Sequence, residues 1–430
     1  MKKLNILLLT LLVSSIGFAQ QTPADKQTKA ITIEGATAHL GNGEVINNAL
    51  IMFENGKLTF VGSATTKIAR QGTIIDAKGK HVYPGFIAPN STLGLVEVDA
   101  VRASNDKDEV GAMNPHIRSI IAYNTESKVV ESMRPNGVLM AQITPRGGRV
   151  SGTSSIVQLD AWNWEDAVIK EDDGIHLNWP SNYSRGRWWL GEPNVLKENK
   201  NYSKQVEELT DYFTQSKAYN ASNKSPKNLP FEALQGLINS SKKLFVHVDN
   251  EKGITDAINF VKAQNIKNVV IVGGYEANNV AELLKQNNIP VLLQRTHSRP
   301  KGDDHDYDLP YKLATQLVNS GVLVGLENSG DMERMNTRNL PFLAGTTVAH
   351  GLTKAQALSL ITLNTAKILG IDDTVGSLEV GKDATLFISE GDALDMRTNK
   401  LEKAFIQGRD ISLETHQTEL YKRYSKKYKQ

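Results

Sequence analysis

Between residues 84 and 370, short apolar runs alternate with segments of helical periodicity, and this alternation constrains the fold more than any other feature. The apolar runs are rich in Val, Ile and Leu and lie at 137–143, 244–248, 269–272, 290–293 and 322–326. Helical patterns lie between them at 254–261 and 280–284. Strands that alternate with helices predict a parallel sheet. A (β/α)8 barrel takes about 250 residues, so we expect an α/β fold with a TIM-like barrel over 83–370.

The two ends of the chain carry β-type sequence instead. Short strand patterns at 31–34, 49–53 and 58–62 are separated by turn signals such as Gly41-Asn42-Gly43. Strand patterns return at 383–388 and 404–409. We therefore expect one small β-sandwich module that is built from both ends, residues 20–82 plus 371–412, with the barrel inserted between them.

Residues 1–19 have the three-part layout of a secretory signal peptide. Lys2 and Lys3 precede an apolar run over 4–16, and Gly17-Phe18-Ala19 is a small-x-small cleavage site. The run is too short to span a membrane, which takes about 20 residues. We expect an exported protein, periplasmic or secreted, soluble and without a membrane span in the mature chain.

The charge balance and the absence of cysteine exclude several functional classes. Removal of Lys2 and Lys3 would reduce the 49 Lys and Arg residues to 47, which equals the number of Asp and Glu residues. A neutral chain shows no nucleic-acid footprint. The positive excess gathers in the basic C-terminal tail, 413–430, which we expect to be a solvated terminus. With no Cys in the sequence, disulfides, thiolate metal sites and Cys nucleophiles are excluded.

The expected barrel opens with Pro84-Gly85-Phe86-Ile87, followed by Leu93-Gly94. These residues resemble the first barrel strand of the amidohydrolase superfamily. The segment that includes Gly147-Gly148 and Ser151-Gly152-Thr153 is similar to the imidazolonepropionase-like subgroup. The resemblance, which spans roughly residues 30–412, implies a barrel that hydrolyses C–N or C–O bonds. Metal ligands would then lie at the C-terminal ends of the strands, with one or two divalent metals activating water.

Residues 351–386, which run from the end of the expected barrel into the β-module, carry the strongest resemblance to the same superfamily. Within it, Thr353 followed by Gln356 three residues later predicts a capping box at the start of a helix. Gly370 stands where a helix is expected to end.

Position by position, the resemblance implies a degenerate metal site. Asn90 and Thr92 stand at the two His positions of the first strand. Gly273 replaces a His of the sixth strand, and Ser329 replaces the Asp of the eighth, which acts as general base in relatives. His247, in the fifth strand, is the one ligand position that is retained. Zinc in a catalytic site normally has three protein ligands and a water, so we expect no resident metal.

Other residues complete the expected pocket or offer weak alternatives. His176 and Tyr275 are pocket positions by the same resemblance, and Asp331 is a weak candidate for the catalytic carboxylate. Charged runs such as 331–334 are more often solvated loops. His297 and His305 are weak metal candidates in a loop after a barrel strand, although their spacing matches no EF-hand or zinc pattern.

Five tryptophans lie close together in the sequence. They could line a binding cleft or a protein interface, or they could pack an insertion against the barrel. They are Trp162, Trp164, Trp179, Trp188 and Trp189.

We therefore expect an exported amidohydrolase-superfamily protein that has lost most metal ligands and acts as a non-catalytic binding or partner subunit. Its partner would be an active relative or a second copy of the chain. One alternative is an active hydrolase of C–N bonds, in dipeptides or non-peptide compounds, with a rebuilt site and a divalent metal such as zinc. A second alternative is a glycan- or peptide-binding module. Fold alone does not decide among them.

Overall fold

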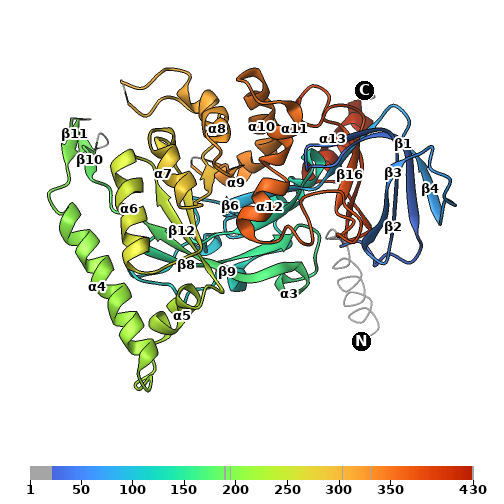
Figure 1. The fold of residues 1–430 in the computed structure, drawn as a ribbon. Helices are drawn as coiled ribbons and strands as arrows, with labels where there is room; N and C mark the ends of the chain where they lie inside the picture. The colour runs from blue at the N-terminus through green and yellow to red at the C-terminus, as the bar shows by residue number, and fades with distance from the viewer. Residues whose placement is uncertain (1–21, 188–189, 194, 303, 331, 429–430) are drawn as a thin grey trace, which may run out of the picture.

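A computed structural model describes residues 22–187, 190–193, 195–302, 304–330 and 332–428. The expected signal peptide at 1–19 lies outside these residues, as do Trp188, Trp189 and Asp331. No helix within the described ranges is long and apolar enough to cross a membrane. Figure 1 shows a β-rich domain beside a larger α/β domain.

Strands from both ends of the chain form the β-rich domain, on the right of Figure 1. Its strands are β1 (Ile31–His39), β2 (Val45–Glu54), β3 (Lys57–Ser63), β4 (Thr73–Asp76), β5 (His81–Pro84), β16 (Leu386–Ser389), β17 (Leu401–Ile406) and β18 (Arg409–Ile411). The order is β18-β17-β16-β5-β1-β2-β3, and β4 pairs with β1. The strands thus form one hydrogen-bonded sheet that branches at β1. Ile33, Phe53 and Phe405 belong to its own apolar core.

The larger domain is built around a second, nearly closed sheet of eight strands. They are β6 (Phe86–Ser91), β7 (Val138–Ile143), β8 (Val150–Gln158), β9 (Val168–Asn178), β12 (Lys243–Val248), β13 (Val269–Gly273), β14 (Val291–Leu293) and β15 (Val324–Leu326), neighbours in that order. The seam between β15 and β6 is bridged by two hydrogen bonds: Leu326 N donates to Leu360 O and Ile87 N donates to Ile361 O, both at 3.0 Å. The expected TIM-like barrel is therefore closed with the help of the segment that precedes its last helix.

One strand departs from the expected pattern of eight parallel strands. β8 runs antiparallel to both β7 and β9, whereas the other neighbours pair in parallel. The reason is the short connection 144–149, because a parallel crossover needs about a dozen residues or more. Gly147 and Gly148, at φ 79 and 62, let the chain reverse there. This turn carries Arg146 to the mouth of the barrel.

Helices pack around the barrel, and α4 with α5 extends away from it at the lower left of Figure 1. The longer helices are α4 (Tyr202–Ala221), α5 (Leu229–Ile238), α6 (Glu251–Ala263), α7 (Ala281–Gln286), α8 (Leu309–Asn319), α10 (Leu340–Ala349), α11 (Lys354–Ser359) and α12 (Leu363–Leu369). Single turns form α2 (Lys128–Glu131), α3 (Trp164–Ala167) and α9 (Glu333–Asn336). The predicted capping box of Thr353 and Gln356 starts α11, and Gly370 ends α12 at φ 72, so both predictions are confirmed.

Two peripheral elements complete the chain. β10 (Tyr183–Arg185) pairs with β11 (Leu196–Glu198) in a small hairpin near the barrel mouth. The basic tail forms α13 (His416–Tyr428), none of whose residues is buried.

Candidate functional site at the barrel mouth

Five of the predicted pocket positions lie at or near the C-terminal ends of barrel strands, where barrel enzymes place their active sites. Counted from β6, His247 is on the fifth strand, Gly273 ends the sixth and Ser329 follows the eighth, while Asn90 is on the first and His176 on the fourth. A cavity of about 250 Å³ opens there. Its lining includes Trp179, His247, Gly273, Gln294 and Ser329.

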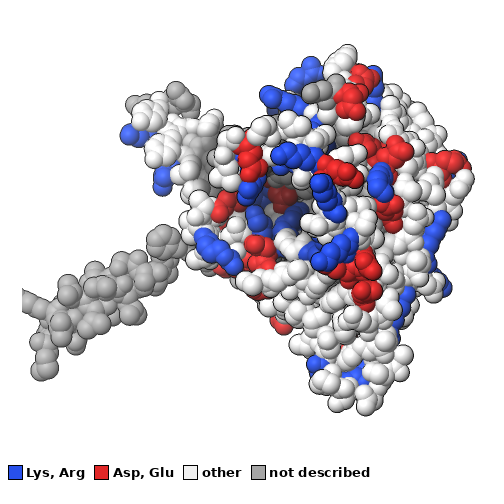
Figure 2. Space-filling view, turned by 90° about the vertical axis from the view of Figure 1, so that its left-hand side faces the viewer, with Lys and Arg blue, Asp and Glu red and all other residues white. Residues whose placement is uncertain are grey.

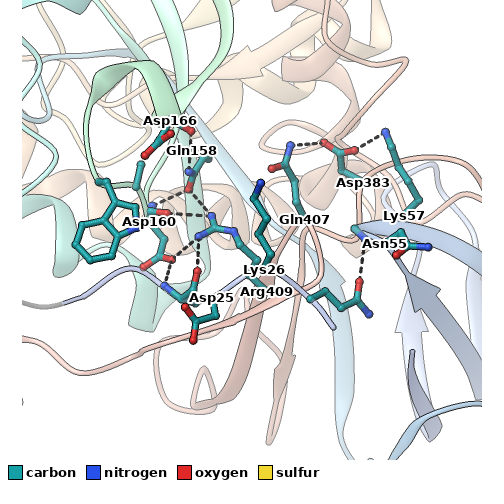
Figure 3. A pocket seen from close by; sticks show the side chains of 15 residues that line it. Asp25, Lys26, Asn55, Lys57, Gln158, Asp160, Asp166, Asp383, Gln407 and Arg409 are labelled. Carbon is teal, nitrogen blue, oxygen red and sulfur yellow. Dashed lines mark hydrogen bonds and ion pairs between the residues drawn. The ribbon is translucent and has the colours of Figure 1, made fainter. Parts of the chain in front are cut away.

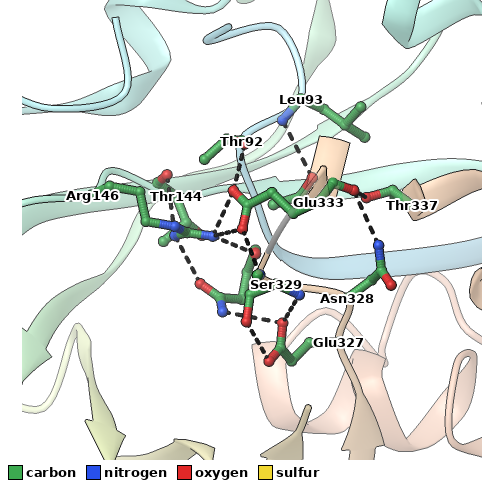
Figure 4. A network of polar contacts seen from close by, with 12 residues as sticks. Thr92, Leu93, Thr144, Arg146, Glu327, Asn328, Ser329, Glu333 and Thr337 are labelled. Atoms are coloured by element: carbon green, nitrogen blue, oxygen red, sulfur yellow. Dashed lines mark hydrogen bonds and ion pairs between the residues drawn. The ribbon is translucent and has the colours of Figure 1, made fainter. Parts of the chain in front are cut away.

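Arg146 occupies the side of the mouth formed by the first strand (Figure 4). Its Nη1 donates to Asn90 Oδ1 at 2.9 Å and its Nη2 to Asn90 O at 2.8 Å. Nη2 also lies 3.2 Å from both carboxylate oxygens of Glu333, and Thr92 Oγ1 donates to the same carboxylate at 2.5 Å. Asn90 has φ 50, a left-handed conformation that Asn tolerates better than most residues. Asn90 and Thr92, the two first-strand positions, therefore form hydrogen bonds to an arginine–glutamate ion pair.

Glu327, a residue that the sequence analysis missed, lies fully buried behind this pair. Its carboxyl accepts hydrogen bonds from Ser329 Oγ at 2.7 Å, from Ser329 N and from Asn90 Nδ2 at 3.3 Å. Burial raises the pKa of Glu327 to about 7, although the bonds from Ser329 and the charge of Arg146 act in the opposite direction. The carboxyl group therefore changes charge close to neutral pH. A charged residue directly after the buried strand β15 is the sequence signal that could have identified it.

A second chain of polar contacts runs from the cavity into the barrel. His247 Nε2 lies 2.8 Å from His176 Nδ1, and His176 Nε2 lies 2.9 Å from Ser154 Oγ. Ser154 Oγ donates to Asp173 Oδ1 at 2.7 Å, and Gln142 Nε2 donates to the other oxygen of that carboxylate at 2.8 Å. His176, Ser154 and Asp173 are buried, and His247 is half-buried at the cavity wall.

The direction of each hydrogen bond in this chain follows from the single proton of the Ser154 hydroxyl. That proton goes to Asp173, so His176 must donate from Nε2 and accept at Nδ1. His247 then donates from Nε2, and its Nδ1 keeps a lone pair. Burial, together with the charge of Arg146, lowers the pKa of His247 to about 3, and burial beside His247 lowers that of His176 well below its usual value. Burial raises the pKa of Asp173 to about 6. At pH 7 both imidazoles are therefore neutral.

The donors at the mouth do not fit a resident divalent metal. Two nitrogens bound to one zinc lie roughly 3.3 Å apart in tetrahedral geometry, but those of His176 and His247 face each other at 2.8 Å and share a proton. The guanidinium of Arg146 adds a fixed positive charge that lowers the pKa of both imidazoles. Among the described residues, no three His, Asp or Glu side chains are grouped as metal ligands.

The other predicted pocket residues lie further out. An outer cavity of about 940 Å³ adjoins the inner one and includes Tyr275 and His305 in its lining. Tyr275 OH accepts from Lys301 N at 3.2 Å, and His305 Nε2 lies 3.3 Å from Glu276. His297 is exposed and contacts Thr346 on α10 at 2.6 Å. The two weak metal candidates thus have different partners, and Asp331 lies outside the described residues.

The described tryptophans do not share one cleft. Trp179 is buried beside the inner cavity and packs edge-on against Phe260, with ring centroids 5.5 Å apart. Trp164 packs against the core, whereas Trp162 is 63% exposed. Each of these three therefore lies in a different environment.

Trp162 lines a separate cavity of about 660 Å³ between the barrel and the β-rich domain (Figure 3). Asp160 lies at its wall, with its side chain 2% exposed, and pairs with Arg134 at 2.7 Å and Arg409 at 2.9 Å. The same carboxylate accepts from Ala24 N at 2.9 Å. These contacts join the segment before β1, the end of β8 and β18, so this region has a structural role.

Comparisons with known proteins agree with the fold. The model of the amidohydrolase family matches residues 232–411. An imidazolonepropionase of Thermoanaerobacter pseudethanolicus is 21% identical in an alignment 409 positions long that covers 82% of this chain and 86% of that protein. A 5'-deoxyadenosine deaminase of Methanobrevibacter smithii is 22% identical in an alignment 382 positions long that covers 80% of each chain. The crystal structure of an amidohydrolase from Thermotoga maritima superposes with a TM-score of 0.76 at 24% identity, over 88% of this chain and 99% of that one.

Proposed function

This chain belongs to the amidohydrolase superfamily, and from that premise we propose that it is an exported, non-catalytic member whose barrel mouth binds a ligand or a partner. Members of the superfamily typically use divalent metals. Here the observation that carries the proposal is that the first-strand positions Asn90 and Thr92 are engaged by the Arg146–Glu333 ion pair. A fixed guanidinium repels a metal cation from the same space.

The rest of the proposal concerns location and partners. The layout of residues 1–19 supports export. The partner would be an active relative or a second copy of this chain. In either case this protein supplies a preformed cavity with two neutral imidazoles, and an active relative as partner would supply any hydrolysis.

Metal content and turnover test the proposal together. The mature chain is incubated with zinc, dialysed and analysed by elemental mass spectrometry, then assayed on amides, lactams and dipeptides. An imidazolonepropionase serves as the positive control. We expect no stoichiometric zinc and no turnover. Stoichiometric zinc together with turnover that is lost in His247→Ala would overturn the proposal.

A rebuilt variant supplies the matched comparison. Asn90→His, Thr92→His, Gly273→His and Ser329→Asp return the side chains of relatives, and Arg146→Ala removes the guanidinium. If the loss of ligands is what prevents metal binding, this variant gains zinc at the stoichiometry of the control enzyme. A variant with the other four substitutions that retains Arg146 should gain less zinc, because the fixed positive charge remains.

Hydrolysis of C–N bonds is the second candidate function, and one observation favours it. His176 and His247 are neighbours, so a rebuilt site would start with two imidazoles rather than one. Zinc titration of the wild type, followed by His176 and His247 resonances, separates the two candidates. Saturable shifts at both histidines favour the hydrolase, and unchanged resonances favour the binding role.

A further inference from the structure

We propose that the barrel mouth binds a molecule that ends in a primary ammonium group, held between the carboxylate of Asp249, the ring of Tyr275 and the imidazole of His247. The inference rests on the proposed binding role of this mouth and adds the chemical class of the ligand. In the free protein, the ammonium group of Lys301 occupies part of this position.

Lys301 shows the chemistry of the site. Its Nζ lies 2.6 Å from Asp249 Oδ2 and 5.1 Å from the centroid of the Tyr275 ring. A carboxylate and an aromatic face are the two groups that recognise ammonium ions in proteins. Lys301 belongs to the loop between β14 and α8 and is itself partly exposed. An incoming ammonium group can therefore replace it without disturbing the barrel core.

Asp249 has an acceptor that the chain leaves without a partner. Its Oδ1 has no hydrogen-bond partner among the described residues, and the side chain is 46% exposed, so this oxygen is available to a donor once the carboxylate turns. Asp249 lines both the inner and the outer cavity. Rotation about its last side-chain torsion, which has a broad energy minimum, turns this oxygen toward either cavity.

Gly273 makes this position of Asp249 possible. A Cβ atom on Gly273 would lie 2.6 Å from Asp249 Oδ1, so any larger residue would displace the carboxylate. The position that holds a His in relatives therefore became, as Gly, the space for an acidic side chain. Loss of a metal ligand and gain of an ammonium-binding carboxylate are the same structural change.

His247 provides a second acceptor on the inner side. Because its Nε2 donates to His176, its Nδ1 presents a lone pair, and Nδ1 has no hydrogen-bond partner among the described residues. The half-buried ring lines the inner cavity together with Asp249. Two acceptors in one small cavity suit a group with several N–H donors, which an ammonium ion has.

The outer cavity favours a cation over an anion. Figure 2 faces the side on which β10 and β11 lie and shows a hollow with both basic and acidic side chains in and around it. The described lining of the outer cavity has more acidic than basic side chains. The acidic residues are Asp249, Glu251, Asp256, Glu276 and Asp304. The outer cavity has room for the remainder of an aminoalkyl chain or for the residues that follow a peptide N-terminus.

Calorimetric titration of the mature chain at pH 7.5 tests the proposal. Cadaverine and glycylglycinamide are the two ammonium probes, and 1,5-pentanediol and N-acetylglycylglycinamide are their uncharged counterparts. We expect at least one ammonium probe to bind at least ten-fold more tightly than its counterpart. Binding of cadaverine alone indicates a free amine as ligand, and binding of glycylglycinamide indicates a peptide N-terminus. Equal affinity for charged and uncharged probes overturns the proposal.

Three variants make the test specific to this site. Asp249→Asn should weaken binding at least ten-fold. Lys301→Met should strengthen it several-fold, because the competing ammonium group is gone. Lys252→Met is the matched control, since Lys252 lines the same outer cavity but pairs with Asp256 at 2.8 Å. Equal gains in probe affinity in Lys301→Met and Lys252→Met would mean a general charge effect and would overturn the proposal. An absence of probe binding in both the wild type and Lys301→Met would overturn it as well.

The same samples distinguish failure of this inference from failure of the proposed function. Each titrated mixture is analysed for hydrolysis products and for zinc. Binding with hydrolysis supports the ammonium site but contradicts the non-catalytic role. Absence of both binding and hydrolysis contradicts the ammonium site and leaves the non-catalytic role intact.

Discussion

Arg146 binds Asn90 twice, with Nη1 2.9 Å from its side-chain oxygen and Nη2 2.8 Å from its backbone carbonyl oxygen. The two bonds connect the turn after β7 to the end of β6 and hold Asn90 in its left-handed conformation. Arg146 also neutralises Glu333, the first residue of α9. One side chain thus orders three segments of the barrel mouth.

Arg146→Met should therefore destabilise the protein. The change leaves the half-buried carboxylate of Glu333 without its cation, and we expect a loss of about 2–3 kcal/mol in the free energy of unfolding. Arg397→Met is the control, because Arg397 is 83% exposed in its pair with Asp395, and it should cost less than about 0.5 kcal/mol. Urea unfolding of both variants measures the difference. Equal costs would contradict the structural role of Arg146.

Gly273→Ala should be more destabilising than its backbone conformation alone requires. Gly273 has φ 95, and its new Cβ would also meet Asp249 at 2.6 Å. Gly381, at φ 92, has open space around its Cβ position, so Gly381→Ala measures the conformational cost alone, about 1 kcal/mol. Because Asp249 Oδ1 is the end of a rotatable side chain that is 46% exposed, we expect Gly273→Ala to lose only about a further 1 kcal/mol. Thermal unfolding compares the two, and similar losses would show that Asp249 moves away without cost.

Glu327 should make the stability depend on pH near neutrality. Its folded pKa of about 7 exceeds the ordinary value of 4.5, so the folded state holds the proton more firmly than the unfolded state does. The contribution of Glu327 to the free energy of unfolding is complete below pH 4.5. It is lost as the pH rises through 7, and the loss is on the order of 3 kcal/mol. Glu327→Gln lacks this titration. As the pH rises from 5 to 8, the free energy of unfolding of the wild type should therefore fall relative to that of Glu327→Gln. A difference between the two that stays constant over this range would refute the assignment.

The two histidines of the barrel interior should both be neutral and protonated on Nε2. This follows from the chain of hydrogen bonds that ends on Asp173, and from the lowered pKa values of both rings. Nitrogen chemical shifts of histidine-labelled protein distinguish the tautomers, and His176→Gln and His247→Gln assign the signals. A His247 ring that carries its proton on Nδ1 at pH 7 would reverse the direction of the chain and remove the acceptor from the cavity.

Asp160→Asn should loosen the contact between the two domains. Asp160 is buried between Arg134 and Arg409, and an amide cannot neutralise both guanidinium groups. Removal of one charge from a buried network costs about 3–5 kcal/mol. Asp395→Asn, at an exposed pair, is the matched control and should change stability by less than about 0.5 kcal/mol. Protease cleavage near Ala24 should accelerate only in the first variant, because Asp160 also holds the backbone there.

Strand positions could be predicted from the sequence because apolar runs and glycine signals are local. Gly273 and His247 were assigned to the sixth and fifth strands, and the structure places them there. The direction of β8 was missed, since the turn glycines at 147 and 148 were interpreted as part of a family resemblance rather than as a reversal. The shortness of the connection 144–149 was the sequence signal for the antiparallel direction of β8.

The contacts of the mouth could not be predicted in the same way. Arg146 is a single cation in a turn, and its partners Asn90 and Glu333 lie 56 and 187 residues away along the chain. Local pattern does not report contacts at such separations. Glu327 is different, because a charged residue that ends a buried strand is visible in the sequence and indicates a functional or paired group.

The pairing of β5 with β16 has a consequence for how the chain is made. The strands β1, β2 and β3 can pair with one another early, and β5 can pair with β1. Pro84 pairs with Leu386, however, so the other edge of β5 meets its partner only when nearly the whole chain has been synthesised. Until then that edge of β5 is open to pairing with other chains. Long-range pairing of this kind is also slow. A nascent chain of this protein therefore depends on protection of one edge of β5 until β16 arrives, and a chain that stops before residue 386 leaves β5 without β16.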